Sequence, residues 1–418
     1  MKIAFLIPAI DAMGPNIFTL NLVKSLLAFS DVYCEVFHFD RGAKDIKQLE
    51  FPVKVTKLMF KDKYNFDEFD IIHSTMPVPD LYVAKHKLYK EHLCITSMHC
   101  FMKDDLYQRK GRIKGWIEVQ LWKLALNKFK NIIVSSTFME DYYCKELSSY
   151  HSYSIIPYGI PVLEKQETDV VVINRIKELH KKYKILCGCG SLIKRKRFHQ
   201  LIAYLRHNTG AAVVLIGRGN QEDNLRKLAK ELGVSDRVLF LGFLKDSYNY
   251  YSYIDAYCMC SNSEGFGLAM IEAMQMGTPI ICSNLPIYID YFNKNNVGLF
   301  EFNNQDSFNQ AADTVLADID YYSQQSKKLA NGIFSLGNMG RKHYDYYKEL
   351  LKKNNAVKRF LSVDIAKEMS IIAIVFGHIA YQYPFCQLVN TKDLFIYLWH
   401  VAVFFLLAGF FIKEEQLV

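Results

Sequence analysis

The stretch Ala212–Phe243, AVVLIGRGNQEDNLRKLAKELGVSDRVLFLGF, predicts one complete strand–helix–strand unit. Its two ends are short apolar runs bounded by glycine, as in buried strands, and the segment between them has the spacing of an amphipathic helix. That helix is expected to end at Gly233, because glycine adopts the left-handed conformation of a helix C-cap without strain. A helix that connects two strands in this way indicates a parallel sheet.

Units of this kind occur in two series along the chain. Strands of the first series are expected at 2–9, 33–39, 69–75, 93–99 and 131–136. Strands of the second series are expected at 183–190, 211–219, 237–243, 255–261 and 278–283. Residues 157–169 combine two prolines, a glycine and several charges, which suits a linker between the two series.

The predicted fold class is therefore α/β, with two Rossmann-like domains and a C-terminal two-helix membrane segment. The expected parts are domains at 1–157 and 158–335, a helix at 336–357 that returns across them, and a membrane hairpin at 358–418. Ligands of such folds bind at the carboxyl ends of the strands. A ligand site is therefore expected where the two domains face each other.

Composition limits the classes of partner. The chain has 418 residues and a formal net charge of +8, from 51 basic and 43 acidic side chains. This mild excess is not typical of a nucleic-acid-binding protein, and it also suits an anionic ligand or an anionic lipid. Ten cysteines follow an N-terminus without a signal-peptide pattern, so we expect reduced thiols. Their spacing does not match a zinc site, and no metal is expected.

The last sixty residues differ in composition from the rest. Residues 369–385 and Leu394–Ile412 are apolar and almost uncharged, and the second segment has about the length that a bilayer core requires. Basic residues before and after the pair predict that both ends are cytoplasmic. A buried core helix is the alternative for either segment alone. The pair together favours an anchor on the cytoplasmic face of the cell membrane.

The segment Ser263–Ile281, SEGFGLAMIEAMQMGTPII, contains two carboxylates eight residues apart, Glu264 and Glu272. A helix is expected to begin near Gly267, and its free N–H groups and partial positive charge would suit a diphosphate. Glu264 would then meet a sugar hydroxyl, and Glu272, about one and a half turns into the helix, would meet a ribose hydroxyl. The alternative is that Glu264 stabilises the helix dipole and Glu272 lies on a solvated face.

These residues resemble the retaining glycosyltransferases of family four. That family has an E-x7-E motif, a helix of small residues and the pattern G-x-P-[IV]-[IV], and similar segments here are Ala212–Phe243 and Cys189–Ile202. The resemblance covers about residues 1–350. It implies the two-domain GT-B arrangement, with an acceptor-side domain at 1–157 and a nucleotide-sugar-binding domain at 158–335. It also implies sugar transfer with retention, without a metal or another cofactor.

The resemblance assigns roles to individual residues. Lys196 corresponds to the phosphate-binding lysine, and His99, with Glu264, is expected among the catalytic groups. The expected donor-binding residues are Gly14, Ser191, Arg195, Gly217, Gly219, Phe243, Phe266, Gly267, Leu268 and Glu272. Ser191 stands where the family has an arginine, which leaves Lys194 or Arg195 to replace that diphosphate contact. His73 matches a second family histidine less closely. A structural role is the alternative for either histidine.

Leu106–Asn131 mixes seven basic residues with two tryptophans. A helix with basic and aromatic residues suggests contact with an anionic lipid surface. An ordinary helix with a solvated basic face and core tryptophans is the alternative.

The tail resembles the opening of the acyltransferase-three membrane family, in which a basic residue precedes a histidine at the spacing of Lys367 and His378. Because members of that family have many more membrane helices, we expect a truncated remnant that serves as an anchor.

The predicted activity is transfer of a hexose from a nucleotide-sugar to a growing cell-surface glycan or a lipid-linked acceptor, with no nucleic acid as partner. Three alternatives stay open. They are a sugar-nucleotide epimerase on the same fold, an inactive scaffold in polysaccharide assembly, and a bifunctional glycosyl- and acyltransferase. Ser191 and the single glycine at Gly14 favour the scaffold.

Overall fold

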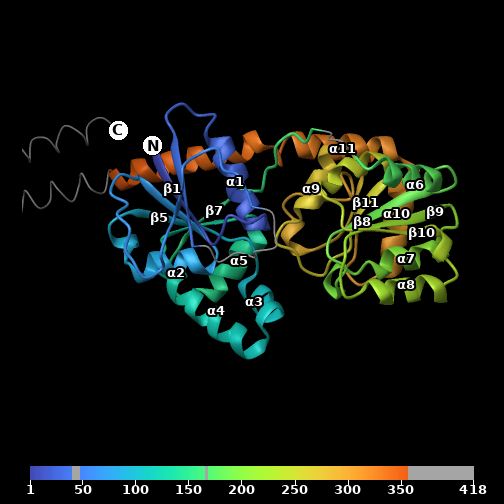
Figure 1. Cartoon of the computed structure of the whole chain (residues 1–418), viewed down its shortest axis with the longest axis horizontal. Helices are drawn as coiled ribbons and strands as arrows, with labels where there is room; N and C mark the ends of the chain where they lie inside the picture. Colours follow the sequence, from blue (N-terminus) through green and yellow to red (C-terminus); the bar gives the residue numbers. More distant parts are fainter. Residues whose placement is uncertain (40–47, 165–167, 356–418) are drawn as a thin grey trace, which may run out of the picture. The chain divides into compact units, whose positions relative to one another are not determined.

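The computed structural model describes residues 1–39, 48–164 and 168–355. Within them, two parallel sheets are present, and helices flank each sheet (Figure 1). The strand order is β3-β2-β1-β4-β5-β6-β7 in the first sheet and β10-β9-β8-β11-β12-β13 in the second. This confirms the predicted pair of Rossmann-like α/β domains.

The first sheet lies in the N-terminal part of the chain. Its strands are β1 (Lys2–Ile7), β2 (Tyr33–His38), β3 (Val55–Lys57), β4 (Ile71–Thr75), β5 (Leu93–Ser97), β6 (Asn131–Val134) and β7 (Ser152–Ile155). Its helices are α1 (Gly14–Leu26), α2 (Pro77–Lys85), α3 (Met102–Lys110), α4 (Arg112–Leu126) and α5 (Thr137–Glu146), with a short 3-10 turn, η1 (Leu88–Lys90). The five predicted strands are all present.

The second sheet follows α6 (Val170–His180). Its strands are β8 (Lys184–Cys189), β9 (Ala211–Ile216), β10 (Val238–Gly242), β11 (Ala256–Met259), β12 (Ile280–Ser283) and β13 (Gly298–Phe300). The helices between and after them are α7 (His199–His207), α8 (Glu222–Glu231), α9 (Leu268–Gln275), α10 (Gln305–Ala317) and α11 (Ile319–Asn331). Short 3-10 turns are η2 (Lys194–Lys196), η3 (Ser235–Arg237), η4 (Ser247–Tyr253) and η5 (Pro286–Tyr288).

The strand–helix–strand unit predicted from Ala212–Phe243 is confirmed as β9, α8 and β10. The two strands pair in parallel. Gly233 follows the helix with a φ of +68°, the conformation that a C-cap glycine supplies. β9 is buried and the edge strand β10 is partly buried. Helices α7, α8 and α10 contribute to one core cluster with β8, β9 and β11.

Three strands were not predicted, namely β3, β7 and β13. Each lies at the edge of its sheet and has three or four residues. An edge strand needs no continuous apolar run, and the sequences VTK and SYSI leave side chains partly exposed. Their pattern therefore does not stand out from the adjoining loops.

The predicted linker at 157–169 contains a backbone contact with a distant segment. Ile160 donates its N–H to the carbonyl of Phe334, and Leu336 donates to the carbonyl of Ile160. Residues 336–355 are helical. Tyr344 of this helix stacks on Phe29, which follows α1, at a centroid distance of 4.1 Å.

No helix among the described residues is long and apolar enough to cross a membrane. The predicted hairpin at 358–418, with Lys367 and His378, lies outside the described residues.

A buried carboxylate fixes α4 to the first sheet. Asp80, on α2, is fully buried and accepts hydrogen bonds from Ser74, Thr96 and the indole N–H of Trp122 on α4. Burial raises the pKa of Asp80 to about 6, although these hydrogen bonds oppose the shift.

Asp80→Asn is expected to lower the free energy of unfolding by about 1–3 kcal/mol, because its amide would place a donor against another donor. Urea unfolding measures this change. Trp122→Phe removes the facing N–H, so the cost of Asp80→Asn should shrink in that background. Equal costs in the two backgrounds would contradict this account of the contact.

Candidate active site

Two loops meet at the carboxyl ends of the adjacent strands β8 and β11. The first follows β8 and contains Arg195 and Lys196, and the second follows β11 and contains Ser263 and Glu264. Arg195 donates to the carbonyl of Ser263 at 2.7 Å, and the N–H of Asn262 donates to the carbonyl of Arg195 at 3.0 Å. The loops therefore hold each other through backbone and side-chain contacts.

Glu264 and Lys196 form the central contact of these loops. Lys196 Nζ lies 2.7 Å from Glu264 Oε1, and Arg195 Nη1 lies 3.7 Å from Glu264 Oε2. Glu264 is 8% exposed. Its burial raises the pKa, but the charges of Lys196 and Arg195, with hydrogen bonds from Lys196 and Ser261, outweigh burial and hold the pKa below its ordinary value. Glu264 is therefore a carboxylate at neutral pH.

Glycines allow these loops to approach closely. Gly217 has a φ of +139°, and a Cβ there would lie 1.9 Å from the carbonyl oxygen of Gly190. A Cβ on Gly219 would lie 2.4 Å from the carbonyl oxygen of Leu192. These two predicted donor-binding residues thus have a packing role, which is to seat the loop after β9 against the loop that carries Lys196.

Helix α9 begins directly after this loop, as the sequence predicts. Gly267 precedes it with a φ of +92°, and its first turn contains no acidic residue. Among the described residues, no side chain caps the helix, so its first N–H groups lack a side-chain acceptor there and carry the partial positive charge of the helix dipole.

Glu272 lies further along α9 in a different environment. No hydrogen bond or ion pair reaches its carboxylate among the described residues. Burial, with a smaller effect from the charge of Asp246, raises the pKa of Glu272 from 4.5 to about 7. A carboxylate in this state gains most from a ligand that donates hydroxyl hydrogen bonds.

His99 follows β5 in the first domain and contacts the Glu264 loop. A Cβ on Gly265 would lie 2.3 Å from the carbonyl oxygen of His99. Nδ1 of His99 is hydrogen-bonded to the hydroxyl of Tyr158, whereas Nε2 is buried and has no partner among the described residues. Burial, and to a lesser degree the nearby His343, lowers the pKa of His99 to about 3, so its ring is neutral.

Other predicted residues are placed differently. Phe266 is 2% exposed and packs against Tyr158 at 4.9 Å, so its side chain belongs to an aromatic cluster. Phe243 is 70% exposed. Ser191 is exposed, and Gly14 begins α1 with open space around it. None of these four residues takes part in the Lys196–Glu264 contact.

His73 is buried on β4 and hydrogen-bonded to Ser97 at 2.7 Å. This buried, hydrogen-bonded position favours a structural role for His73 over a role in the active site.

Sequence reasoning missed Tyr158, which lies in the segment taken as a linker. It contacts both His99 and Phe266, and its aromatic side chain between a proline and a glycine was the signal available. It also missed Asp246, whose charge contributes to the pKa of Glu272.

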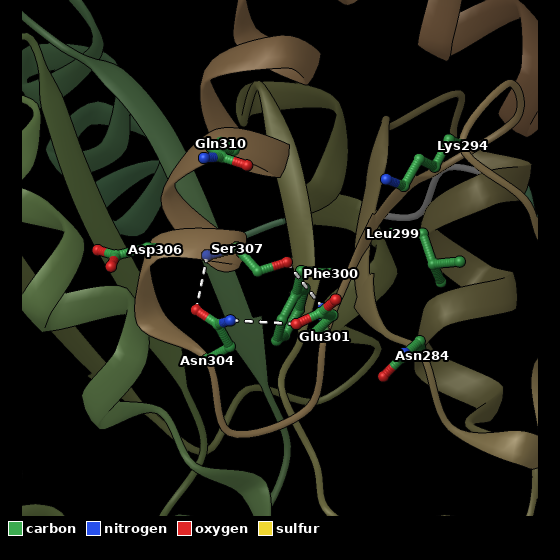
Figure 2. A pocket seen from close by; sticks show the side chains of 9 residues that line it. All are labelled: Asn284, Lys294, Leu299, Phe300, Glu301, Asn304, Asp306, Ser307 and Gln310. Atoms are coloured by element: carbon green, nitrogen blue, oxygen red, sulfur yellow. Dashed lines mark hydrogen bonds between the residues drawn. The ribbon is translucent and has the colours of Figure 1, made fainter.

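A separate hollow of about 410 Å³ lies beside β13 and α10 and contains none of the predicted residues. In Figure 2, Asn304, Ser307 and Glu301 are joined by hydrogen bonds, and Asp306 points away. Asn304 caps α10 through its side chain. Glu301, Asn304 and Ser307 are therefore engaged in contacts at the start of α10.

Comparison with known proteins agrees with this geometry. Residues 170–331 match the family model described as glycosyl transferases group 1. The matched residues include Lys196, Glu264 and Glu272.

Relatives extend the similarity beyond these matched residues. The chain is 28% identical over 363 residues to the O-antigen biosynthesis glycosyltransferase WclY of Escherichia coli, covering 84% of this chain and 99% of that protein. It is 31% identical over 136 residues to the lipopolysaccharide core biosynthesis glycosyltransferase LpsE of Rhizobium meliloti, covering 32% of this chain and 40% of that protein.

Solved structures show the fold. Anabaena Alr3699/HepE in complex with UDP has a TM-score of 0.67 at 17% identity, covering 84% of this chain and 100% of that one. The apo form of the lipopolysaccharide outer core galactosyltransferase WaaB has a TM-score of 0.61 at 17% identity, covering 83% and 100%. Both likenesses support the GT-B arrangement of two parallel-sheet domains.

Proposed function

We propose that this chain is a retaining glycosyltransferase of the hexosyltransferase type, which moves a sugar from a nucleotide-sugar to a growing cell-surface glycan. The observation that carries the proposal is the Lys196–Glu264 contact of 2.7 Å beside the uncapped start of α9. A cation and a helix N-terminus together suit a diphosphate leaving group, whose negative charge grows as the glycosidic bond breaks.

The two carboxylates bind rather than attack. Glu264 is ionised and forms an ion pair with Lys196. A bound diphosphate would contact Lys196 as well, and Glu264 would accept a hydrogen bond from a sugar hydroxyl. Glu272 accepts from ribose hydroxyls, which supply the donors that its carboxylate lacks. The proposed displacement is on the front face of the sugar and is assisted by the leaving phosphate. It needs no metal and no other cofactor.

His99 contributes a neutral donor. Burial raises the pKa of Tyr158 well above its ordinary value, so the tyrosine keeps its proton and donates a hydrogen bond to Nδ1 of His99. This hydrogen bond selects the tautomer with hydrogen on Nε2, the ring atom without a partner among the described residues. Nε2 would therefore donate to a hydroxyl of the donor sugar or the acceptor.

The relatives suggest the substrates. Structures of Anabaena Alr3699/HepE contain UDP or UDP-glucose, and the relatives include O-antigen and lipopolysaccharide core glycosyltransferases. We therefore put forward a nucleotide-sugar donor, with a UDP-sugar first, and a glycan or lipid-linked acceptor.

Binding and turnover measurements test this function. UDP-, GDP- and ADP-sugars are compared by calorimetry, and nucleotide release is followed with and without an acceptor glycan. Release that depends on the acceptor supports sugar transfer, whereas interconversion of the donor sugar without an acceptor would identify an epimerase. The anomeric configuration of the product, determined by NMR, tests retention.

Ser191 favours a second candidate, an inactive scaffold in polysaccharide assembly. Its short, exposed side chain replaces the family's arginine, which removes one diphosphate contact. If none of the nucleotide-sugars binds to the folded chain, the result supports an inactive scaffold and contradicts the proposed enzyme.

The sequence supports a further proposal for residues 358–418, which is that they anchor the enzyme on the cytoplasmic face of the membrane without acyltransferase activity. A chain ended at Asn355 is expected to become more soluble and to retain sugar transfer to a soluble acceptor. Its solubility and its kcat, compared with those of the full chain, measure both effects. Loss of transfer in a folded truncation, or acyl transfer by the full chain that Lys367→Ala or His378→Ala abolishes, would contradict the anchor proposal.

A further inference from the structure

Helix α4 (Arg112–Leu126) is apolar on two opposite faces. One face is buried against the protein, and Trp122 on it reaches Asp80 of α2. The buried residues are Gly115, Val119, Trp122, Ala125 and Leu126. A helix in a soluble domain normally needs one such face, with polar residues opposite.

The opposite face of α4 carries a second apolar stripe, defined here as Ile113, Trp116, Ile117, Leu121 and Leu124. These five side chains are between 47% and 80% exposed. At 3.6 residues per turn they fall within an arc of about 140°. Single exposed apolar side chains are common on any protein surface, but five on one stripe indicate an interaction surface. Figure 1 shows α4 beside α3, with which it packs.

Cations flank the stripe, and those nearest to it have no acidic partner. Arg112 and Lys114 are exposed on its two sides, and no ion pair engages either of them among the described residues. Three of the other five basic residues in Leu106–Asn131 are paired, with Arg109 on Asp105, Lys110 on Glu118, and Lys123 on Glu146. Leu106–Asn131 contains seven basic residues and one acidic residue. The partner of the stripe should therefore be both apolar and anionic.

A hollow adjoins the stripe at its N-terminal end. It has a volume of about 580 Å³ and is lined by Tyr107, Arg112, Ile113 and Trp116. Arg112 thus lies beside aromatic and aliphatic side chains, a combination that suits a phosphate group next to an acyl chain.

We propose that α4 docks on the surface of an anionic lipid bilayer, with the stripe in the interfacial region and Arg112 and Lys114 at the headgroups. Tryptophan and aliphatic residues enter that region, and each cation gains from the negative surface potential. A second copy of the chain fits the face less well, because a symmetric contact would bring Arg112 and Lys114 of both copies together. This docking does not depend on which sugar is transferred.

The test measures the fluorescence of Trp116 itself, so that vesicle binding through other parts of the chain is not mistaken for contact by the stripe. The full chain carries Trp399→Phe, which leaves Trp116 and the buried Trp122 as its tryptophans. Vesicles contain equal parts of phosphatidylglycerol and phosphatidylcholine with brominated acyl chains. We expect the emission of Trp116 to shift to the blue and to be quenched, with weaker quenching as salt increases. Subtraction of the spectrum of a Trp116→Phe variant isolates this signal.

A pair of charge reversals supplies the matched control. Arg112→Glu with Lys114→Glu is expected to raise the lipid concentration for half-maximal quenching about tenfold or more at low salt. Arg175→Glu with Lys182→Glu makes the same change of charge away from the stripe, at one position on α6 and one just after it. This pair should leave the lipid concentration for half-maximal quenching nearly unchanged. All four positions are exposed, so folding should persist, and circular dichroism checks it.

Three results would overturn the proposal. The first is co-flotation of the protein with vesicles while Trp116 stays unquenched, since the contact would then lie elsewhere. The second is an equal effect of the two charge-reversal pairs. The third is a dimer in sedimentation equilibrium without lipid that Ile113→Ser with Leu124→Ser abolishes, because a second copy would then cover the stripe.

Discussion

Lys196→Ala is expected to lower kcat by about 10²–10³ while donor Kd rises less than tenfold. The reason is that negative charge on the leaving diphosphate grows in the transition state, so a cation placed there stabilises the transition state more than the bound donor. In the ligand-free protein, Lys196 is already engaged with Glu264 at 2.7 Å. Much of its attraction for a ground-state phosphate is therefore offset by the contact that it shares.

The measurement is single-turnover and steady-state kinetics with the best nucleotide-sugar from the screen. Lys230→Ala is the control, because Lys230 is an exposed cation on α8 without an ion pair among the described residues. Removal of Lys196 also leaves the buried Glu264 with Arg195 at 3.7 Å as its nearest cation, so the thermal midpoint must be recorded. If kcat of a folded Lys196→Ala protein stayed within a factor of two of wild type, Lys196 would have no role at the leaving group.

Lys196 and Glu264 were both predicted as site residues although 68 residues separate them in sequence, but their direct contact was not predicted. Both follow buried strands with clear apolar runs, and in a parallel sheet the loops after adjacent strands lie at the same edge. That β8 and β11 are adjacent is seen only in the folded sheet. The start of α9 was predicted from local signals alone, because Gly267 and Gly277 mark its ends.

Other features of the site depend on contacts that sequence patterns do not encode. Tyr158 lies in a segment with a linker's composition, and its contact with His99 becomes visible only in the folded chain. The tautomer of His99 depends on that contact. The edge strand β13 shows how a short element is missed where one side of the sheet has no neighbour.

Helix α4 shows a limit of periodicity itself. Trp116 and Trp122 lie on opposite faces of the same helix, and one is 55% exposed whereas the other is 1% exposed. Because both faces are apolar, the sequence pattern cannot say which of them packs on the protein. The face with Trp122 packs on the protein because its indole N–H donates a hydrogen bond to the buried carboxylate of Asp80.

Glu272→Gln is expected to change stability and donor binding in opposite directions. Without donor, the folded-state pKa of Glu272 is about 7 and its ordinary value is 4.5. The folded state therefore holds the proton more tightly than the unfolded state, and ionisation of Glu272 costs stability. This cost is absent below about pH 4.5, grows as pH rises to about 7, and is complete above that pH.

At pH 8, the Gln variant should be more stable than wild type by on the order of 1–3 kcal/mol, and near pH 4.5 the two should be equal. Urea unfolding across this range measures the difference. Glu231→Gln, on the exposed end of α8, is the control and should stay within about 0.5 kcal/mol of wild type at every pH.

Donor binding should respond the other way. Glu272→Gln is expected to raise donor Kd about tenfold or more, because a hydrogen bond to a charged acceptor is worth about 1.5–3 kcal/mol. In wild type, donor affinity should increase between pH 6 and 8 as Glu272 ionises, and in the variant this dependence should be lost. A variant that gains stability but binds the donor as tightly as wild type would show that Glu272 is merely a buried acid. If both effects appear, the loss of stability that ionised Glu272 causes is explained by its role in binding. In the complex, the ribose hydroxyls donate the hydrogen bonds that the carboxylate lacks without donor.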